Sequence, residues 1–128
     1  MREATVTSPN YILIVDDDQK IRTLLGRVVQ NVVPGALVIQ ATNGTEALSA
    51  LQQHAFALVI TDYHMPGASA LDIIAAAHAQ NATTPVIVVS ARSQVEASVR
   101  AAGATAFLAK PFEIEPLTAI LRQVLRSS

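Results

Sequence analysis

Five short runs of apolar and β-branched residues recur along the chain, separated by longer segments of mixed polarity. The runs lie at residues 11–15 (YILIV), 36–40 (ALVIQ), 56–60 (FALVI), 85–89 (PVIVV) and 105–109 (TAFLA). Each run is nearly continuous rather than alternating, which is typical of strands buried on both faces of a parallel sheet. The pattern therefore predicts five buried strands.

The segments between these runs carry apolar residues at helical spacing. After the first run, apolar side chains recur at i, i+3, i+4, i+7 and i+8, namely Ile21, Leu24, Leu25, Val28 and Val29. Pro34-Gly35 then stops this helix. The same reasoning predicts helices near residues 45–53, 69–78, 93–102 and 114–125.

Regular alternation of strands and helices predicts an α/β fold with right-handed crossovers. Such a fold has a doubly wound parallel sheet with helices on both faces. Because no linker or repeat divides the chain, we expect one domain at residues 10–128, preceded by a disordered tail at residues 1–9.

Composition narrows the classes of function. The chain has 128 residues, of which 51% are hydrophobic, and it contains no Cys. The lack of Cys excludes disulfides and thiolate metal sites and favours a reducing, cytoplasmic setting. No apolar run approaches the ~18 residues of a membrane span. A formal net charge of −1 indicates no direct binding to nucleic acid.

Chemically active residues follow four of the five predicted strands. Asp16, Asp17 and Asp18 follow the first, Asp62 the third, Ser90-Ala91 the fourth and Lys110-Pro111 the fifth. Taken singly, the acids and Ser90 are ordinary helix caps and Lys110 is an ordinary solvated lysine. In a parallel sheet, however, all the carboxyl ends lie on one edge, where ligands bind. Crowded carboxylates at that edge predict a hard divalent cation such as Mg²⁺.

The segments ILIVDDD, VITDYHMPG, VVSAR and FLAKPF, in this order and at these intervals, closely resemble the receiver domain of two-component response regulators. The resemblance runs from about Tyr11 to Arg126. It implies a flavodoxin-like sheet with strand order 2-1-3-4-5. It also implies a signalling domain rather than an enzyme, one that promotes its own phosphorylation and dephosphorylation.

By this resemblance, Asp62 is the phosphoacceptor, and its phosphodonor is a phosphohistidine of a sensor histidine kinase or a histidine phosphotransfer protein. Carboxylates are known covalent nucleophiles of this kind. Lys110, the Ser90 hydroxyl and the Ala91 backbone N–H would bind the phosphoryl oxygens, so that positioning and electrostatics carry the catalysis.

The resemblance also implies how Mg²⁺ is held and how the signal is passed on. Asp17 and Asp62 would bind Mg²⁺ directly, Asp16 through water, and His64 through its backbone carbonyl, while Asp18 starts a helix. Phe107 would be the switch aromatic, linking phosphorylation to the surface of the fourth helix, fifth strand and fifth helix. A downstream protein or output domain would read that surface.

Two details bear on the geometry. Ala70 stands where members of the family carry Gly, so we expect a different loop there, since a left-handed backbone suits Ala poorly. The Lys110–Pro111 bond is expected to be cis, as it is in most receivers.

Three other functions remain open from the sequence. An aspartate-nucleophile phosphohydrolase would need a second Asp two residues after the first, where this chain has His64. A flavin-binding electron carrier shares the fold, but Asp16 to Asp18 would repel the flavin phosphate. A receiver-like binding module that works without phosphorylation keeps the fold and loses only the chemistry. Whether the domain stands alone or belongs to a longer regulator is also open.

Overall fold

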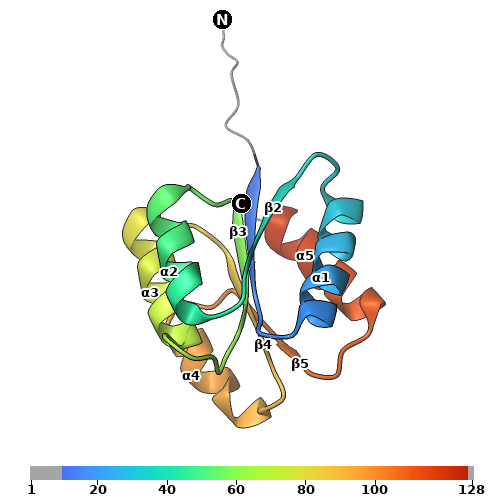
Figure 1. Ribbon diagram of the computed structural model, residues 1–128. Helices are drawn as coiled ribbons and strands as arrows, with labels where there is room; N and C mark the ends of the chain where they lie inside the picture. The colour runs from blue at the N-terminus through green and yellow to red at the C-terminus, as the bar shows by residue number, and fades with distance from the viewer. Residues whose placement is uncertain (1–9, 127–128) are drawn as a thin grey trace, which may run out of the picture.

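The computed structural model describes residues 10–126, so the predicted tail at residues 1–9 lies outside the described residues. These residues form one five-stranded parallel sheet with the order β2-β1-β3-β4-β5, as predicted (Figure 1). The strands are β1 (Tyr11–Val15), β2 (Leu37–Ala41), β3 (Leu58–Asp62), β4 (Val86–Ser90) and β5 (Ala106–Ala109).

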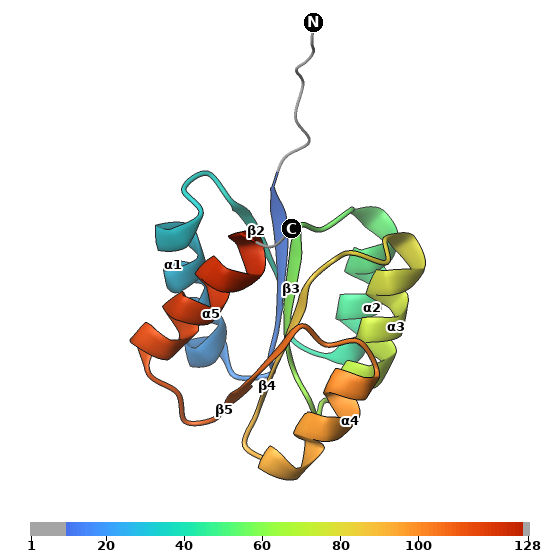
Figure 2. The ribbon, with the colours of Figure 1, turned by 180° about the vertical axis from the view of Figure 1, so that it is seen from behind.

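Helices connect the strands and cover both faces of the sheet. They are α1 (Gln19–Val32), α2 (Gly44–Gln53), α3 (Ala70–Gln80), α4 (Glu96–Ala101) and α5 (Ile114–Arg126). Helices α1 and α5 lie together on one face, and α2, α3 and α4 lie on the other (Figures 1 and 2). Every helix within residues 10–126 falls short of the length and apolar character needed to cross a bilayer.

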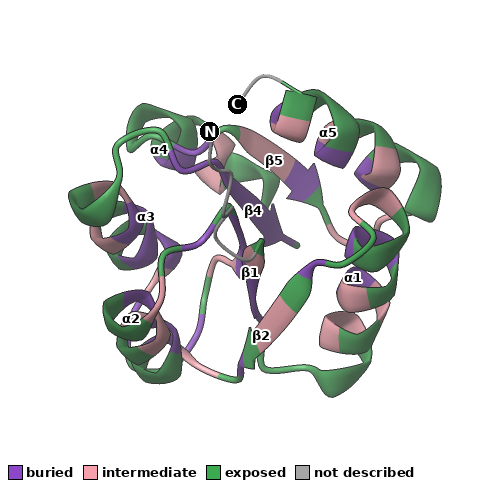
Figure 3. Cartoon of the chain, turned by 90° about the horizontal axis from the view of Figure 1, so that it is seen from above, coloured by how far each residue is buried: buried purple, intermediate pink, exposed green. Residues whose placement is uncertain are grey.

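Each face of the sheet has its own hydrophobic core. Side chains alternate along β1, so Leu13 and Val15 join the core beneath α2 and α3, whereas Ile12 and Ile14 join the core beneath α1 and α5. This is why the runs are nearly continuous in apolar residues rather than alternating. Viewed from above, the buried residues concentrate on the central strands and the helix sides that face them (Figure 3).

Two strands extend further toward their carboxyl ends than the apolar runs predict. Asp62 is the last residue of β3 and pairs with Val89, and Ser90 is the last residue of β4 and pairs with Ala109. The hydrogen-bonded ladder therefore reaches into the polar residues. Strand pairing, which apolar patterning does not report, holds both of these side chains in place.

The predicted helix at residues 93–102 is divided into two parts. Ser93–Val95 form a turn of 3₁₀ helix, and α4 then runs from Glu96 to Ala101. Gly103, with φ of 115°, takes the left-handed conformation just beyond α4. An early stop of this kind is common where glycine follows a helix.

The loop between β3 and α3 accommodates Ala70 at the position where members of the family carry Gly. Ala70 is a fully buried residue at the start of α3, and the left-handed conformation lies instead at Gly67, with φ of 93°. A Cβ added at Gly67 would collide with the Thr45 hydroxyl, and one added at Gly44 would collide with the backbone of Ala68. The loop and the start of α2 therefore touch backbone to backbone.

Candidate functional site

The loop after β1 is held by its own first acid. Asp16 is 1% exposed, and its Oδ1 accepts a hydrogen bond of 2.9 Å from the Asp18 N–H. Asp18 in turn caps α1, because its Oδ1 accepts from the Lys20 N–H at 2.8 Å. Asp17 lies between them and is exposed, as is Asp18, so the loop presents two carboxylates to solvent and buries one. The predicted role of Asp18 at a helix start is confirmed.

Lys110 joins the ends of β1, β3 and β5. Its Nζ lies 2.8 Å from Asp16 Oδ2 and 3.3 Å from Asp62 Oδ1. The backbone N–H of Lys110 also donates to the Ser90 carbonyl at 2.9 Å, and the Lys110–Pro111 bond is cis, as expected. Residues 94 positions apart in sequence thus share one hydrogen bond.

The charges at this edge alter one another's pKa. Burial raises the pKa of the Asp62 carboxyl above its ordinary 3.8, the Lys110 ammonium opposes that rise, and the negative charge of Asp16 reinforces it. Burial alone would lower the pKa of Lys110, but its hydrogen bond to Asp16 and the charges of Asp62 and Asp16 raise it. Lys110 therefore stays protonated, and it does not fully offset the cost of ionising Asp62.

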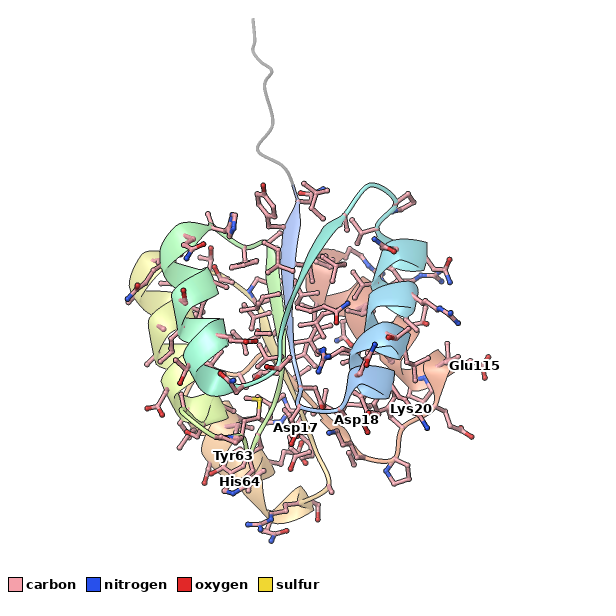
Figure 4. The ribbon with its side chains drawn as sticks, viewed as in Figure 1. Asp17, Asp18, Lys20, Tyr63, His64 and Glu115 are labelled. Atoms are coloured by element: carbon pink, nitrogen blue, oxygen red, sulfur yellow. The ribbon has the colours of Figure 1, made fainter. Side chains whose placement is uncertain are left out.

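The carboxylates of Asp16, Asp17 and Asp62 form a group that fits a hard cation. One oxygen from each lies within 4.8 Å of the others. Carboxylate oxygens without sulfur ligands are the donors that Mg²⁺ prefers. Figure 4 shows Asp17, Tyr63 and His64 at this same end of the sheet, with the exposed His64 in the loop that follows β3.

Ser90 lies at the same edge, and the backbone N–H of Arg92 orients its side chain. It is 4% exposed, and its Oγ accepts from the Arg92 N–H at 3.0 Å. This contact leaves the hydroxyl proton available to another acceptor. Ala91 is exposed beside it. The structure therefore brings Asp16, Asp17, Asp62, Ser90 and Lys110 together, as the sequence predicted.

Phe107 lies away from this group, in the middle of β5. It is half-buried, pairs with Val88 and packs against the core beneath α2 and α3. A cavity of about 240 Å³ adjoins it, lined also by Arg100 from α4 and Ile120 from α5. The aromatic ring therefore has open space beside it, between the two helices that flank β5.

Sequence reasoning missed two residues of the site. Arg22 Nη1 donates to the Asp16 carbonyl at 2.8 Å, and its Nε donates to Gln40 Oε1 at 2.9 Å. Gln40 ends the one predicted strand after which the sequence offers no candidate residue. An arginine four residues after the last acid of the run was the available signal, because its side chain is long enough to reach back to the strand end.

Comparison with known proteins agrees with this geometry. Residues 12–122 match a family model described as the response regulator receiver domain. An uncharacterised transcriptional regulatory protein of Bacillus subtilis, YkoG, is 36% identical over 92% of this chain and 52% of its own length. The transcriptional regulatory protein PrrA of Mycobacterium tuberculosis is 35% identical over 94% of this chain and 52% of its own. The chain thus spans about half the length of these curated relatives.

Solved structures give the same picture. The chemotaxis response regulator CheY4 of Vibrio cholerae superposes with a TM-score of 0.80 at 30% identity, covering 91% of this chain and 99% of that one. The response regulator TrrA of Thermotoga maritima, solved in complex with Mg²⁺ and BeF, has a TM-score of 0.78 at 29% identity, covering 90% and 98%.

Proposed function

Because the chain belongs to the family of response regulator receiver domains and is a receiver of two-component signalling, we propose that Asp62 is its phosphoacceptor. The observation that carries this proposal is the contact of Lys110 Nζ with both Asp62 and the buried Asp16 at the carboxyl edge of the sheet. One fixed ammonium there lies beside a carboxylate that burial makes costly to ionise.

The reaction is a transfer between two nucleophiles. An Asp62 carboxylate oxygen attacks the phosphorus of a phosphohistidine, the O–P bond forms and the N–P bond breaks. The electron pair of the broken bond returns to the imidazole nitrogen, which takes up a proton. Asp62 is 15% exposed, so its carboxylate is accessible to a donor without being fully solvated.

Hydrogen-bond donors at the carboxyl edge of the sheet would stabilise the negative charge on the phosphoryl oxygens. Lys110 would shift its hydrogen bonds toward them, and the free hydroxyl proton of Ser90 and the Ala91 N–H would donate to the others. Donors that are fixed in advance lower the barrier because they need no reorganisation during transfer. The structure of TrrA with Mg²⁺ and BeF supports a site of this kind in the family.

The acid group would hold Mg²⁺, with Asp17 and Asp62 as direct ligands, Asp16 acting through water and the His64 carbonyl adding an oxygen. When bound, the cation supplies positive charge that lets an anionic phosphoryl group approach the carboxylates. Asp17 suits direct ligation because its side chain is exposed, whereas Asp16 is already hydrogen-bonded to Lys110 and Asp18.

An apolar groove beside Lys110 suits the phosphodonor. It has a volume of about 300 Å³ and is lined by Ile21, Leu24, Ala91, Lys110, Pro111 and Phe112. Lys110 and Ala91 belong both to the groove and to the phosphoryl site. A helix of a sensor kinase or phosphotransfer protein lying in this groove would place its phosphohistidine at Asp62.

Receiver domains interact with kinases and with output domains, and the output of this one is proposed to run through Phe107. Phosphorylation adds about −1.5 to −2 charges, which draws the Ser90 hydroxyl inward and favours rotation of Phe107 beside its cavity. The packing of α4, β5 and α5 then shifts between two states. A partner protein or an attached output domain, as the names of the transcriptional relatives suggest, would read that surface in the cytoplasm.

Intact mass after incubation with a small-molecule phosphodonor tests the phosphoacceptor. We expect one phosphoryl adduct that requires both Mg²⁺ and Asp62, and no adduct on Asp62→Asn. Asp18→Asn is the matched control, since Asn also caps helices well and Asp18 is outside the acid group. An adduct on Asp62→Asn would exclude the proposal by showing that another residue accepts the phosphoryl group. No adduct on folded wild type that binds Mg²⁺ would exclude it in favour of a receiver-like module that works without phosphorylation.

A further inference from the structure

Arg22 connects three elements at the carboxyl edge of the sheet. It belongs to α1, yet its guanidinium reaches the Asp16 carbonyl just beyond β1 at 2.8 Å and the Gln40 side chain of β2 at 2.9 Å. Gln40 pairs with Ile14 in the sheet. The guanidinium therefore lies across the ends of two neighbouring strands.

The carbonyl that Arg22 contacts belongs to the peptide unit joining Asp16 to Asp17. A peptide unit is planar, so a donor fixed on its oxygen fixes the orientation of the whole plane and the direction in which the next residue leaves it. Asp16 is held independently, by Ala41 at its N–H and by Asp18 and Lys110 at its carboxylate. Asp17 lies between two peptide units: Arg22 holds the one before it through the Asp16 carbonyl, and the Asp18 N–H, bonded to Asp16 Oδ1, holds the one after it.

Asp17 needs such support because its own side chain has none. Within residues 10–126, the Asp17 carboxylate makes no hydrogen bond or ion pair. It is nevertheless one of the three carboxylates that converge within 4.8 Å. Its place in that group is therefore set by the backbone that carries it.

Gln40 fixes the other side of the guanidinium. An arginine side chain has high rotational freedom, and a single hydrogen bond would leave it loosely placed. The rigid planar fork of a guanidinium can engage two acceptors at once, which a lysine ammonium does not reproduce in the same geometry. The field of Arg22 also reaches α2: the pKa of Glu46 is lowered first by hydrogen bonds from the Thr42 N–H and hydroxyl, and then by Arg22.

We propose that Arg22 is a positioning residue for Asp17, holding the Asp16–Asp17 peptide plane in the orientation that suits cation binding, and that Gln40 braces its guanidinium. This inference rests on the proposed function, because it takes Asp17 to be a metal ligand. Arg22 touches neither the phosphoryl group nor the cation. Its effect is on the affinity for Mg²⁺.

The sign of the effect separates positioning from charge. Arg22 is a cation bonded to the Asp16–Asp17 peptide unit, so removing it for its charge alone would make Mg²⁺ bind more tightly. Removing a support of a metal ligand makes Mg²⁺ bind more weakly, by about tenfold or more in comparable sites. If the contact of Arg22 with the strand only stabilised the fold, its removal would leave the affinity of the folded protein for Mg²⁺ unchanged.

The test is the Kd for Mg²⁺, measured by calorimetry on folded protein without a phosphodonor. For Arg22→Met we expect a Kd about tenfold higher than that of the wild type. Arg27→Met is the matched control, because it removes the same charge from an exposed position on the same helix, and we expect its Kd to be unchanged. Gln40→Met should raise the Kd by about threefold, since it removes only the brace.

Arg22→Lys separates the fork from the charge and covers the case in which Arg22→Met does not fold. We expect the Kd of Arg22→Lys for Mg²⁺ to remain close to that of Arg22→Met. The phosphorylation rate of each variant should approach that of the wild type at saturating Mg²⁺, with only the half-saturating concentration raised.

An Arg22→Met protein with a Kd equal to or lower than that of the wild type would overturn the inference, as would full recovery in Arg22→Lys. These outcomes leave the proposed function standing if the wild type binds Mg²⁺ and forms its adduct. A wild type that does not bind Mg²⁺ would overturn both.

Discussion

The two ends of the same sheet are built in opposite ways. At the amino end, the rings of Tyr11, His54 and Phe56 lie against one another, with centroids 4.6 Å apart for Tyr11–His54 and 5.8 Å for His54–Phe56. At the carboxyl end, Asp16, Asp62 and Lys110 share a small, partly buried space. Ring packing stabilises by burial and dispersion, whereas crowded carboxylates repel one another and lose hydration. Aromatic packing is thus found at one end of the sheet and the candidate functional site at the other.

The largest expected effect tests the stabilising end. Phe56→Ala should lower the free energy of unfolding by about 3 kcal/mol, because it opens a cavity under a ring that is 7% exposed. Urea unfolding measures this loss. Phosphodonor labelling per folded molecule should be unchanged, and a folded variant that loses its adduct would show that the two ends are not separate.

Next comes the ammonium that holds the carboxyl end together. Lys110→Met should lower the free energy of unfolding by about 2 kcal/mol in metal-free buffer, because Asp16, at 1% exposure, keeps a charge without its partner. Lys20→Met, at an exposed position on α1, is the control and should unfold at the same urea concentration as the wild type. Equal stability of both variants would mean that the ion pair makes no net contribution.

Mg²⁺ is expected to stabilise the protein by binding at the carboxyl end of the sheet, independently of the aromatic packing at the amino end. With free Mg²⁺ at ten times its Kd, the native state gains about 1.4 kcal/mol by mass action, so the wild type should melt at a higher temperature. The response of Asp17→Asn should be clearly smaller, and Phe56→Ala should respond as fully as the wild type does. A full response in Asp17→Asn would contradict its role as a ligand.

The smallest effect has the opposite sign and depends on pH. The pKa of Asp62 is raised in the folded state, so ionised Asp62 costs stability above that pKa, and the cost disappears once pH falls below its ordinary 3.8. Metal-free Asp62→Asn should therefore be more stable near pH 7 by about 1 kcal/mol, or roughly 3 °C in Tm. Thermal melts across this range should show the advantage fading in acid. A variant less stable than the wild type at pH 7 would mean that the Lys110 contact outweighs the repulsion.

The order and type of the elements could be predicted from sequence because the central strands β1, β3 and β4 are almost fully buried and each helix buries one face. The edge strands β2 and β5 are partly exposed, so the prediction of five buried strands was wrong for these two. The convergence of Asp16, Asp62, Ser90 and Lys110 followed from that order, since parallel strands all end on one edge. The features that could not be predicted depend on how far the strands pair and on which groups the long side chains contact. Apolar runs did not show that the ladder extends to Asp62 and Ser90.

Side-chain networks were the larger gap. Nothing in the spacing says that Lys110 bonds to Asp16 more closely than to Asp62, because that choice depends on the burial of Asp16. The contact of Arg22 with Gln40 joins the first turn of α1 to the far end of β2, and the apolar pattern carries no information about such a polar contact. Such contacts depend on the twist of the sheet and the direction of long side chains.

The close approach of Gly44 and Gly67 to the neighbouring backbone and side chain has a consequence for protein engineering. Because the loop before α3 fits against the start of α2 with no room for a Cβ on either glycine, the two segments form a single unit of exchange. A chimera that receives residues 63–69 from another receiver must receive residues 43–45 from the same parent, whereas the surface of α5 can be recombined without either.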